Sequence, residues 1–249
     1  MDDGPRDGPV LVSLHALGTD LRVWDWMRPH LPPELRVVRL DMRGHGLSAC
    51  PAPPYKMGTL VSDAEAVMDH LGLRDSAVLG LSVGGMIAQG LAAKRLDLVR
   101  VLILSNTGAK IGTPDLWHGR IDSARAGGLA SLADATLERW FPEPFRSGPD
   151  ATLTRRIMMR QPLDGWVGCA AAIAGTDFYT PTASLRLPTL GIAGDRDGST
   201  PPDLVRETVD LIPGSRFQLI RGAGHLPCVD APCAYAETIA GFLRETGHL

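Results

Sequence analysis

Residues 78–86 read Val78-Leu79-Gly80-Leu81-Ser82-Val83-Gly84-Gly85-Met86, an apolar run that ends in the pattern Gly-x-Ser-x-Gly. The apolar residues from Ser76 to Leu81 predict a buried strand, and a helix-compatible segment from Met86 to Arg95 follows at once. So tight a turn from strand to helix places Ser82 at its apex in a strained conformation. Glycine is expected at 80 and 84 because a Cβ at either position would clash with the neighbouring strand or helix.

This turn makes Ser82 a candidate nucleophile. It lifts the serine hydroxyl above the sheet, and it directs the backbone N–H of Val83 and the positive end of the helix at the same point. The five-residue pattern also occurs in ordinary turns. The inference therefore depends on the strand and helix around it and on partners elsewhere in the chain.

The composition is that of one globular α/β domain. The chain has 249 residues, 44% of them hydrophobic and 21% charged, which allows a large core and an inserted subdomain. A net charge of −3 without a basic patch argues against a nucleic-acid partner, and no apolar segment nears membrane-spanning length. The four cysteines show neither a C-x-x-C pair nor zinc spacing, and the acidic N-terminus lacks a signal-peptide pattern. We expect a cytoplasmic protein with reduced thiols and without metal or cofactor.

Strands and helices alternate along most of the chain. Residues 1–9 are expected to fray. The expected strands are 10–14, 36–40, 76–81, 99–104, 187–193 and 216–220, and the expected helices are 21–31, 59–71, 86–95, 202–212 and 232–244. Nearly every strand is apolar throughout, which predicts a mostly or wholly parallel sheet of about six strands covered on both faces. Ligands of such sheets bind at the carboxyl ends of the strands.

The alternation stops between about residues 113 and 185. Helix-like segments such as Asp122 to Glu138 and Thr152 to Met159 are separated by prolines, and no β-branched run of strand length occurs. We interpret 113–185 as a helical cap, inserted after the strand that ends near Leu104. The core then comprises residues 1–112 and 186–249.

A serine needs a base within hydrogen-bond reach, and the base needs a carboxylate to orient it. Among seven histidines, His225 is the best candidate base, because it follows a strand within a flexible glycine-rich loop; the others are read as structural. Two acids follow the strand 187–193. Asp195 suits a turn-capping role, whereas Asp197 reaches further, so we favour Asp197. The order Ser82, Asp197, His225 is typical of the α/β-hydrolase fold.

An oxyanion hole needs two N–H donors near the serine oxygen. Val83 supplies one, and Leu17, in the loop after the first strand, is the expected second, with Gly18 easing the turn. After the second strand, Asp41 and Arg43 either pair and brace the site or form a solvated surface pair. Both interpretations stay open.

Five segments carry a family resemblance: LGTDLRVWD at 17–25, DMRGHGLS at 41–48, GLSVGGMIAQ at 80–89, NTGAKIGTP at 106–114 and ERWF at 138–141. They resemble the α/β-hydrolase superfamily and, within it, the 3-oxoadipate enol-lactonase family of the β-ketoadipate pathway. The last two are the more specific, because they lie outside the shared catalytic machinery. The resemblance implies an acyl-enzyme on Ser82, with Asp197 and His225 as partners, that opens a small carboxylate-bearing lactone without metal or cofactor.

The sequence departs from the family pattern in four places. Nine residues before the first strand cannot supply the two further strands of relatives, so we expect a shortened sheet. Val83 replaces a frequent Met, and Ala16 replaces a frequent Gly. Ala174 stands where an arginine for the substrate carboxylate is expected. The remaining candidate substrate contacts are Lys110, Arg120, Arg139 and Trp140. The three cations can also be interpreted as surface charges, and the tryptophan as part of the core of the cap.

Three alternatives remain open at this point. The same triad serves a carboxylesterase acting on neutral esters, or a hydrolase that cleaves a C–C bond. From a different class, the fold also suits a small-ligand receptor with vestigial turnover. All of them take a small molecule as partner, and none involves nucleic acid or a membrane.

Overall fold

Seven strands form one sheet in the order β1-β3-β2-β4-β5-β6-β7, in a computed structural model that describes all 249 residues. Six strands run parallel, and only β1 is antiparallel, beside β3. The mostly parallel sheet and its six long strands were predicted and are confirmed. The strands are β1 (Asp2–Asp3), β2 (Val10–Leu14), β3 (Arg36–Leu40), β4 (Ser76–Leu81), β5 (Val99–Ser105), β6 (Thr189–Gly194) and β7 (Arg216–Ile220).

The first residues do not fray, contrary to the prediction. Asp2 accepts two hydrogen bonds of 2.9 Å from the guanidinium of Arg36, and Asp3 pairs with Arg39 at 2.6 Å. The amino group of Met1 also donates to the Arg39 carbonyl at 2.9 Å. Two largely buried arginines on β3 need carboxylate partners, and the N-terminus supplies them. The result is the shortened N-terminal part of the sheet that the sequence predicts.

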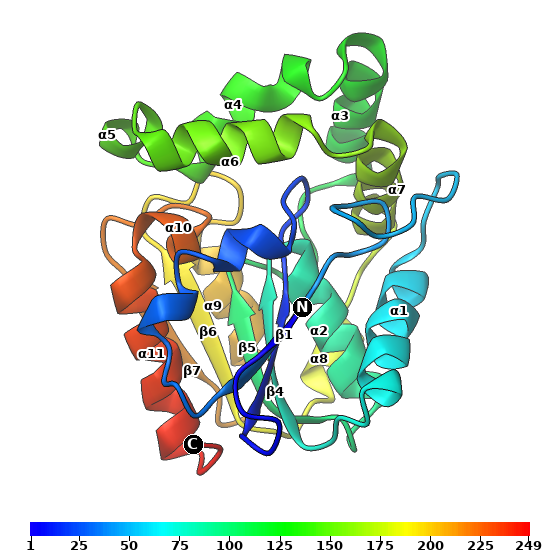
Figure 1. Ribbon diagram of the computed structural model, residues 1–249. Helices are drawn as coiled ribbons and strands as arrows, with labels where there is room; N and C mark the ends of the chain where they lie inside the picture. The colour runs from blue at the N-terminus through cyan, green and yellow to red at the C-terminus, as the bar shows by residue number, and fades with distance from the viewer.

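Helices cover both faces of the sheet, as the apolar strands predict. Val78 and Leu102 point into one core with α1, α2 and α9, whereas Leu79 and Ile103 point into a second core with α11. Figure 1 shows α11 and α1 on opposite sides of the strands. These helices are α1 (Met57–His70), α2 (Val83–Lys94), α9 (Pro202–Asp210), α10 (Pro227–Asp230) and α11 (Pro232–Glu245).

Five helices lie above the carboxyl ends of the strands (Figure 1). They are α3 (Pro114–Gly127), α4 (Ala130–Trp140), α5 (Glu143–Arg146), α6 (Pro149–Met159) and α7 (Leu163–Ala174). The next helix, α8 (Tyr179–Ala183), packs beside α2, where the Thr182 hydroxyl donates to Gln89 Oε1 at 2.7 Å. The last residues of the predicted cap 113–185 thus pack beside α2.

Two expected helices are wrong in detail. The segment 122–138 is divided between α3 and α4, because Gly128 adopts a φ of 68° that ends the first helix. The segment 21–31 forms two 3₁₀ turns, η1 (Leu21–Trp24) and η2 (Arg28–His30). Pro29 has no N–H to donate to the Asp25 carbonyl, so an α-helix cannot continue through it. None of the helices combines the length and the apolar composition that a membrane span would need.

Candidate active site

Ser82 lies between β4 and α2 with a φ of 58° and a ψ of −119°, outside the regions that suit a residue with a side chain. Two contacts from the end of β5 hold it there. The Ser82 N–H donates to the Ser105 carbonyl at 3.0 Å, and the Thr107 hydroxyl donates to the Ser82 carbonyl at 2.6 Å. The predicted strained turn is therefore confirmed.

The two glycines of the turn permit a close approach of backbone to backbone. A Cβ at Gly80 would lie 2.3 Å from the carbonyl oxygen of Gly84 in α2. A Cβ at Gly84 would lie 2.1 Å from the carbonyl oxygen of Leu14 in β2. Both distances are far below van der Waals contact, so the expected clashes with helix and strand are confirmed.

His225 and Asp197 meet above the sheet, in the loops after β7 and β6. His225 Nδ1 donates to Asp197 Oδ2 at 2.8 Å, and both side chains are buried. This bond places the ring proton on Nδ1 and leaves Nε2 free to accept a proton. Asp195 instead accepts the Gly222 N–H at 2.7 Å and braces the loop before the histidine.

The carboxylate of Asp197 is surrounded by donors. Its Oδ1 accepts the N–H groups of Ser199 and Thr200 at 2.7 and 3.0 Å, and its Oδ2 accepts Asn106 Nδ2 at 2.9 Å and the Thr200 hydroxyl at 2.7 Å. Burial would raise the pKa of Asp197, but the charge and hydrogen bond of His225, together with Asn106 and Thr200, hold this pKa below its ordinary value. Asn106 was missed by sequence reasoning, although it directly follows a strand and begins the segment 106–114.

The end of α4 supports both of these loops. The Trp140 carbonyl accepts the His225 N–H at 2.7 Å, and the Arg139 carbonyl accepts the Gly198 N–H at 2.9 Å. The rings of Trp140 and His225 are stacked, with centroids 6.3 Å apart and planes inclined by 24°. Trp140 is thus a wall of the site as well as part of the cap.

Ser82 and His225 line one cavity of about 60 Å³ beneath the cap. The serine hydroxyl forms no hydrogen bond within the protein, an arrangement common in ligand-free sites. Leu17 also lines the cavity, and its N–H has no acceptor in the protein. Val83 is the first residue of α2, so its N–H has no partner within the helix. Neither N–H therefore has an acceptor within the protein, as the predicted role of both residues requires. The other lining residues are Ile111, Trp117, Arg120, Leu132, Thr136, Arg139, Trp140, Trp166, Ser199 and Thr200.

Two arginines of the cap face this cavity without a carboxylate partner. Arg120 from α3 packs over the Trp117 ring, 4.8 Å from its centroid, and Arg139 from α4 donates to the Thr136 hydroxyl at 3.1 Å. Burial lowers the pKa of both guanidinium groups, and the charge of Arg139 lowers that of Arg120 further. Glu138 opposes this shift at Arg139 but forms no ion pair with it, so two partly buried like charges without an ion-pair partner favour an anionic ligand. Lys110 is not part of this group, because it is exposed and pairs with Asp177 at 3.1 Å.

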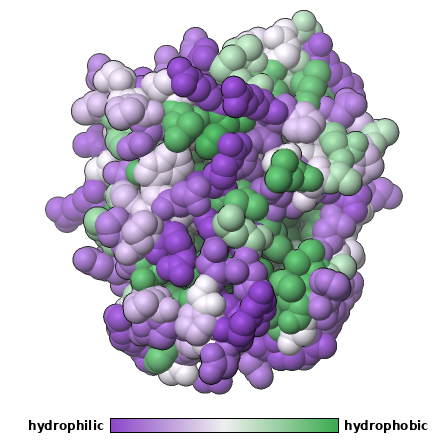
Figure 2. Space-filling model, viewed as in Figure 1, coloured by the Kyte–Doolittle hydropathy of each residue, from purple (hydrophilic) through white to green (hydrophobic).

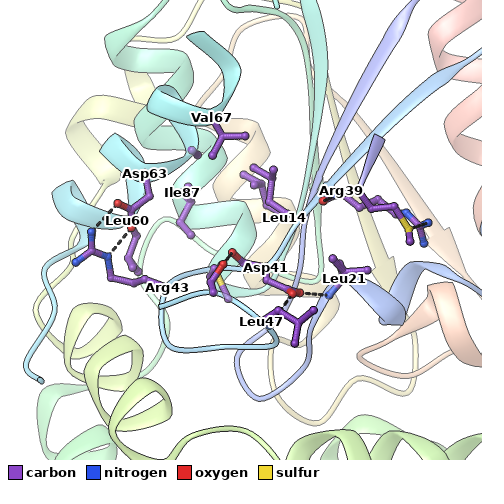
Figure 3. A pocket seen from close by; sticks show the side chains of 15 residues that line it. Leu14, Leu21, Arg39, Asp41, Arg43, Leu47, Leu60, Asp63, Val67 and Ile87 are labelled. Atoms are coloured by element: carbon purple, nitrogen blue, oxygen red, sulfur yellow. Dashed lines mark hydrogen bonds and ion pairs between the residues drawn. The ribbon is translucent and has the colours of Figure 1, made fainter. Parts of the chain in front are cut away.

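Asp41 and Arg43 do not pair with each other, which corrects both interpretations of them. Asp41 accepts the N–H groups of Leu21 and Leu47 at 2.8 and 3.0 Å, and Arg43 donates to Asp63 at 2.6 Å. Figure 3 shows the two side chains turned apart at the rim of a second hollow of about 300 Å³ beside α1. Hydrophobic residues gather there on the face shown in Figure 2. This hollow contains none of Ser82, Asp197 and His225, whereas Ser82 and His225 line the smaller cavity.

The model of the Alpha/beta hydrolase family matches residues 10–238, and the chain belongs to this family. It is 30% identical to 3-oxoadipate enol-lactonase 1 of Acinetobacter baylyi, over 97% of this chain and 91% of that protein. The crystal structure of the enol-lactonase from Burkholderia xenovorans is 32% identical with a TM-score of 0.94, covering 98% of this chain and 95% of that one. A malate-bound thermophilic esterase from Thermogutta terrifontis is 29% identical with a TM-score of 0.92, covering 99% and 92%. Enol-lactonases and esterases are carboxylic ester hydrolases, which confirms the predicted family resemblance and enzyme class.

Proposed function

We propose that this protein is a serine hydrolase that opens a small carboxylate-bearing lactone through an acyl-enzyme. Ser82 is the nucleophile, His225 the general base and acid, and Asp197 the residue that orients His225. The hydrogen bond from His225 to Asp197 supports these roles. The Asp197 carboxylate accepts several further hydrogen bonds, so it remains ionised and stabilises the imidazolium that forms.

The reaction follows from these positions. His225 Nε2 takes the Ser82 proton while the serine oxygen attacks the lactone carbonyl, and the N–H groups of Val83 and Leu17 bind the oxyanion. When the ring C–O bond breaks, His225 returns the proton to the leaving oxygen, which stays tethered to the acyl group. In an enol-lactone this oxygen leaves as an enolate, so the acid step is undemanding. Water that is deprotonated by His225 then releases the acid and restores Ser82.

The observation that carries the substrate class is the pair of cap arginines. Arg120 and Arg139 share the cavity with Ser82, and neither has an ion-pair partner. They stand on α3 and α4, and so supply the positive charge that Ala174 on α7 does not. A substrate carboxylate between them would relieve their mutual repulsion and fix the lactone carbonyl over Ser82. The similarity to enol-lactonases supports the same substrate class.

A matched pair of substrates tests this function. An enol-lactone with a free carboxylate is compared with its methyl ester, which removes the charge and keeps the reacting ring. We expect kcat/KM to favour the carboxylate form at least about tenfold. Arg120→Met and Arg139→Met should each remove most of that preference, by raising KM for the charged substrate alone. Equal kcat/KM for both substrates in the parent protein would contradict the assignment of the arginines.

The serine mechanism has its own test. Ser82→Ala is expected to keep the fold and to lose at least about a thousandfold in kcat on every substrate. Far-UV circular dichroism provides the control for folding. Near-parental turnover by the folded variant would remove Ser82 from the mechanism.

A carboxylesterase for small neutral esters is the second candidate. The cavity walls include the indole rings of Trp117, Trp140 and Trp166, which suit an apolar acyl group. The same substrate pair separates the two functions, because a carboxylesterase of this kind would prefer the methyl ester and would gain activity when either arginine is neutralised.

A further inference from the structure

Two loops that follow neighbouring strands are joined beside the candidate oxyanion hole. The loop 15–20 follows β2, and the loop 41–48 follows β3. His15 Nε2 accepts the Met42 N–H at 3.0 Å, and His45 Nε2 accepts the Gly18 N–H at 3.1 Å. Each loop therefore contributes one imidazole acceptor to a backbone N–H of the other. The two rings are in tilted contact, with centroids 5.5 Å apart.

The peptide groups on either side of Leu17 are both held. The Ala16 carbonyl, which shares a peptide plane with the Leu17 N–H, accepts the Thr19 N–H at 3.1 Å, the Thr19 hydroxyl at 2.9 Å and the His15 Nδ1–H at 2.9 Å. Because C=O and N–H point in opposite directions across a trans peptide, this turns the Leu17 N–H away from Thr19. The following peptide carries the Gly18 N–H. Gly18 has a φ of 80°, so without an acceptor this flexible residue would let the loop rotate.

His45 is suited to be that acceptor. Its side chain is fully buried, and accepting the Gly18 N–H at Nε2 places the ring proton on Nδ1. Nδ1 faces the Arg43 carbonyl at 3.4 Å and Cys169 Sγ at 3.9 Å. Burial, together with the neighbouring His15, lowers the pKa of His45 to about 3, so the ring stays neutral at ordinary pH.

The cap prevents His45 from withdrawing. A Cβ on Gly165 in α7 would lie 1.8 Å from the Gly44 carbonyl oxygen, so the two backbones are in direct contact. On the other side of His45, the Gly46 N–H donates to Gln161 Oε1 at 2.8 Å. Both neighbours of His45 are thus held by the cap, and the ring is held against the loop of Leu17.

We propose that His45 is a positioning residue for the oxyanion hole, which holds the Leu17 N–H toward the Ser82 oxygen by accepting the Gly18 N–H. The inference rests on the proposed serine mechanism. His45 touches neither the substrate nor Ser82. Its effect is expected in the transition state, where the oxyanion exists, and not in substrate binding.

Three substitutions of His45 test the inference. His45→Leu removes the acceptor, His45→Gln places an amide oxygen near the former Nε2, and His45→Asn places one near the former Nδ1, too short to reach Gly18. The assay is hydrolysis of a small p-nitrophenyl ester. We expect His45→Leu and His45→Asn to lower kcat about ten- to a hundredfold and to keep KM within about threefold of the parent. This is smaller than the loss of about a hundred- to a thousandfold that follows removal of one whole oxyanion donor, because the Leu17 N–H is misdirected rather than removed. His45→Gln should recover most of the parental kcat. The matched control is His70→Leu, an exposed histidine at the end of α1, which should leave kcat unchanged.

An oxyanion mimic supplies a readout that a general loss of structure would not give. An aliphatic trifluoromethyl ketone adds to Ser82 and places an oxyanion in the hole, so its affinity should fall by the same factor as kcat. The matching trifluoromethyl carbinol, which has no carbonyl for Ser82 to attack and so forms no oxyanion, should bind His45→Leu as tightly as the parent. Parental kcat in a folded His45→Leu variant overturns the inference, and so does an equal loss in the Gln and Asn variants. If His45→Leu does not fold, the comparison of Gln with Asn carries the test.

The failure of this inference is separable from failure of the proposed function. If Ser82→Ala is inactive while His45→Leu keeps parental kcat, only the role of His45 is wrong. If Ser82→Ala keeps parental turnover, the serine mechanism and the role of His45 are both wrong.

Discussion

Replacing Asp230 by asparagine is expected to change how the stability of the protein depends on pH. Asp230 Oδ2 accepts the Gly224 N–H at 2.7 Å, next to His225, while its buried Oδ1 has no hydrogen-bond partner. Burial, assisted by the charge of Asp197 and opposed by the Gly224 N–H, raises the pKa of Asp230 to about 7. Ionisation is therefore more costly in the folded protein than in the unfolded chain.

The sign and size follow from proton linkage. Between the ordinary carboxyl value of 3.8 and about 7, the folded protein binds more protons than the unfolded chain, so this carboxyl makes the free energy of unfolding fall as pH rises. At about 1.4 kcal/mol per pH unit, the loss across this window is at most about 4 kcal/mol. Asparagine keeps an acceptor for Gly224 and has no charge to bury. We expect Asp230→Asn to exceed the parental free energy of unfolding by up to about 1.6 kcal/mol at pH 5 and by up to about 4 kcal/mol at pH 8, so the difference should grow with pH across this range.

The measurement is urea unfolding of both proteins at pH 5, 6, 7 and 8, followed by circular dichroism. Only the difference between the two curves is used, so other titrating groups cancel. A control variant, Asp195→Asn, removes a partly exposed carboxylate that accepts the Gly222 N–H in the loop before His225, and it shows what the loss of a carboxylate from this region does by itself. Parallel pH curves for the parent and Asp230→Asn would refute the reasoning, because they would mean that Asp230 ionises as easily in the folded protein as in the unfolded chain.

Three further outcomes follow from the structure. Asp197→Asn should keep the fold and lower kcat by about a thousand- to ten-thousandfold in steady-state kinetics, because the His225 ring loses its orientation and its charge partner; a loss below about tenfold would speak against the triad. Gly84→Ala should lower the thermal midpoint strongly or prevent folding, since its Cβ would lie 2.1 Å from the Leu14 carbonyl oxygen, and an unchanged midpoint would mean that α2 can shift freely. Gly128→Ala should cost about 1 kcal/mol in urea unfolding because its φ is 68°, without any effect on KM; a stabilised variant would show that the break between α3 and α4 is not held in this conformation.

The predictions that held depend on short-range rules. The apolar run from Ser76 to Leu81 followed by Gly-x-Ser-x-Gly permits few conformations, because Gly80 and Gly84 each leave no room for a Cβ. The predictions that failed depend on contacts distant in sequence. The helix predicted over 21–31 failed because the hydrophobic spacing continues across Pro29 although the helix cannot. Residues 1–9 were predicted to fray because nothing in the local sequence indicates that Arg36 and Arg39 bind the N-terminus to the sheet.

What the amino-acid order determined alone is the alternation of strands and helices, the serine turn, and the sequence of Ser82, Asp197 and His225 along the chain, because each follows from local sterics and hydrophobic pattern. Tertiary packing decided which side chains come into contact and whether the titratable ones among them are charged. Only the folded chain brings Asn106 to Asp197, Arg120 to Arg139, and His45 to Gly18. These pairs join separate loops and helices, and their hydrogen bonds and pKa values depend on how completely the surrounding layers exclude water.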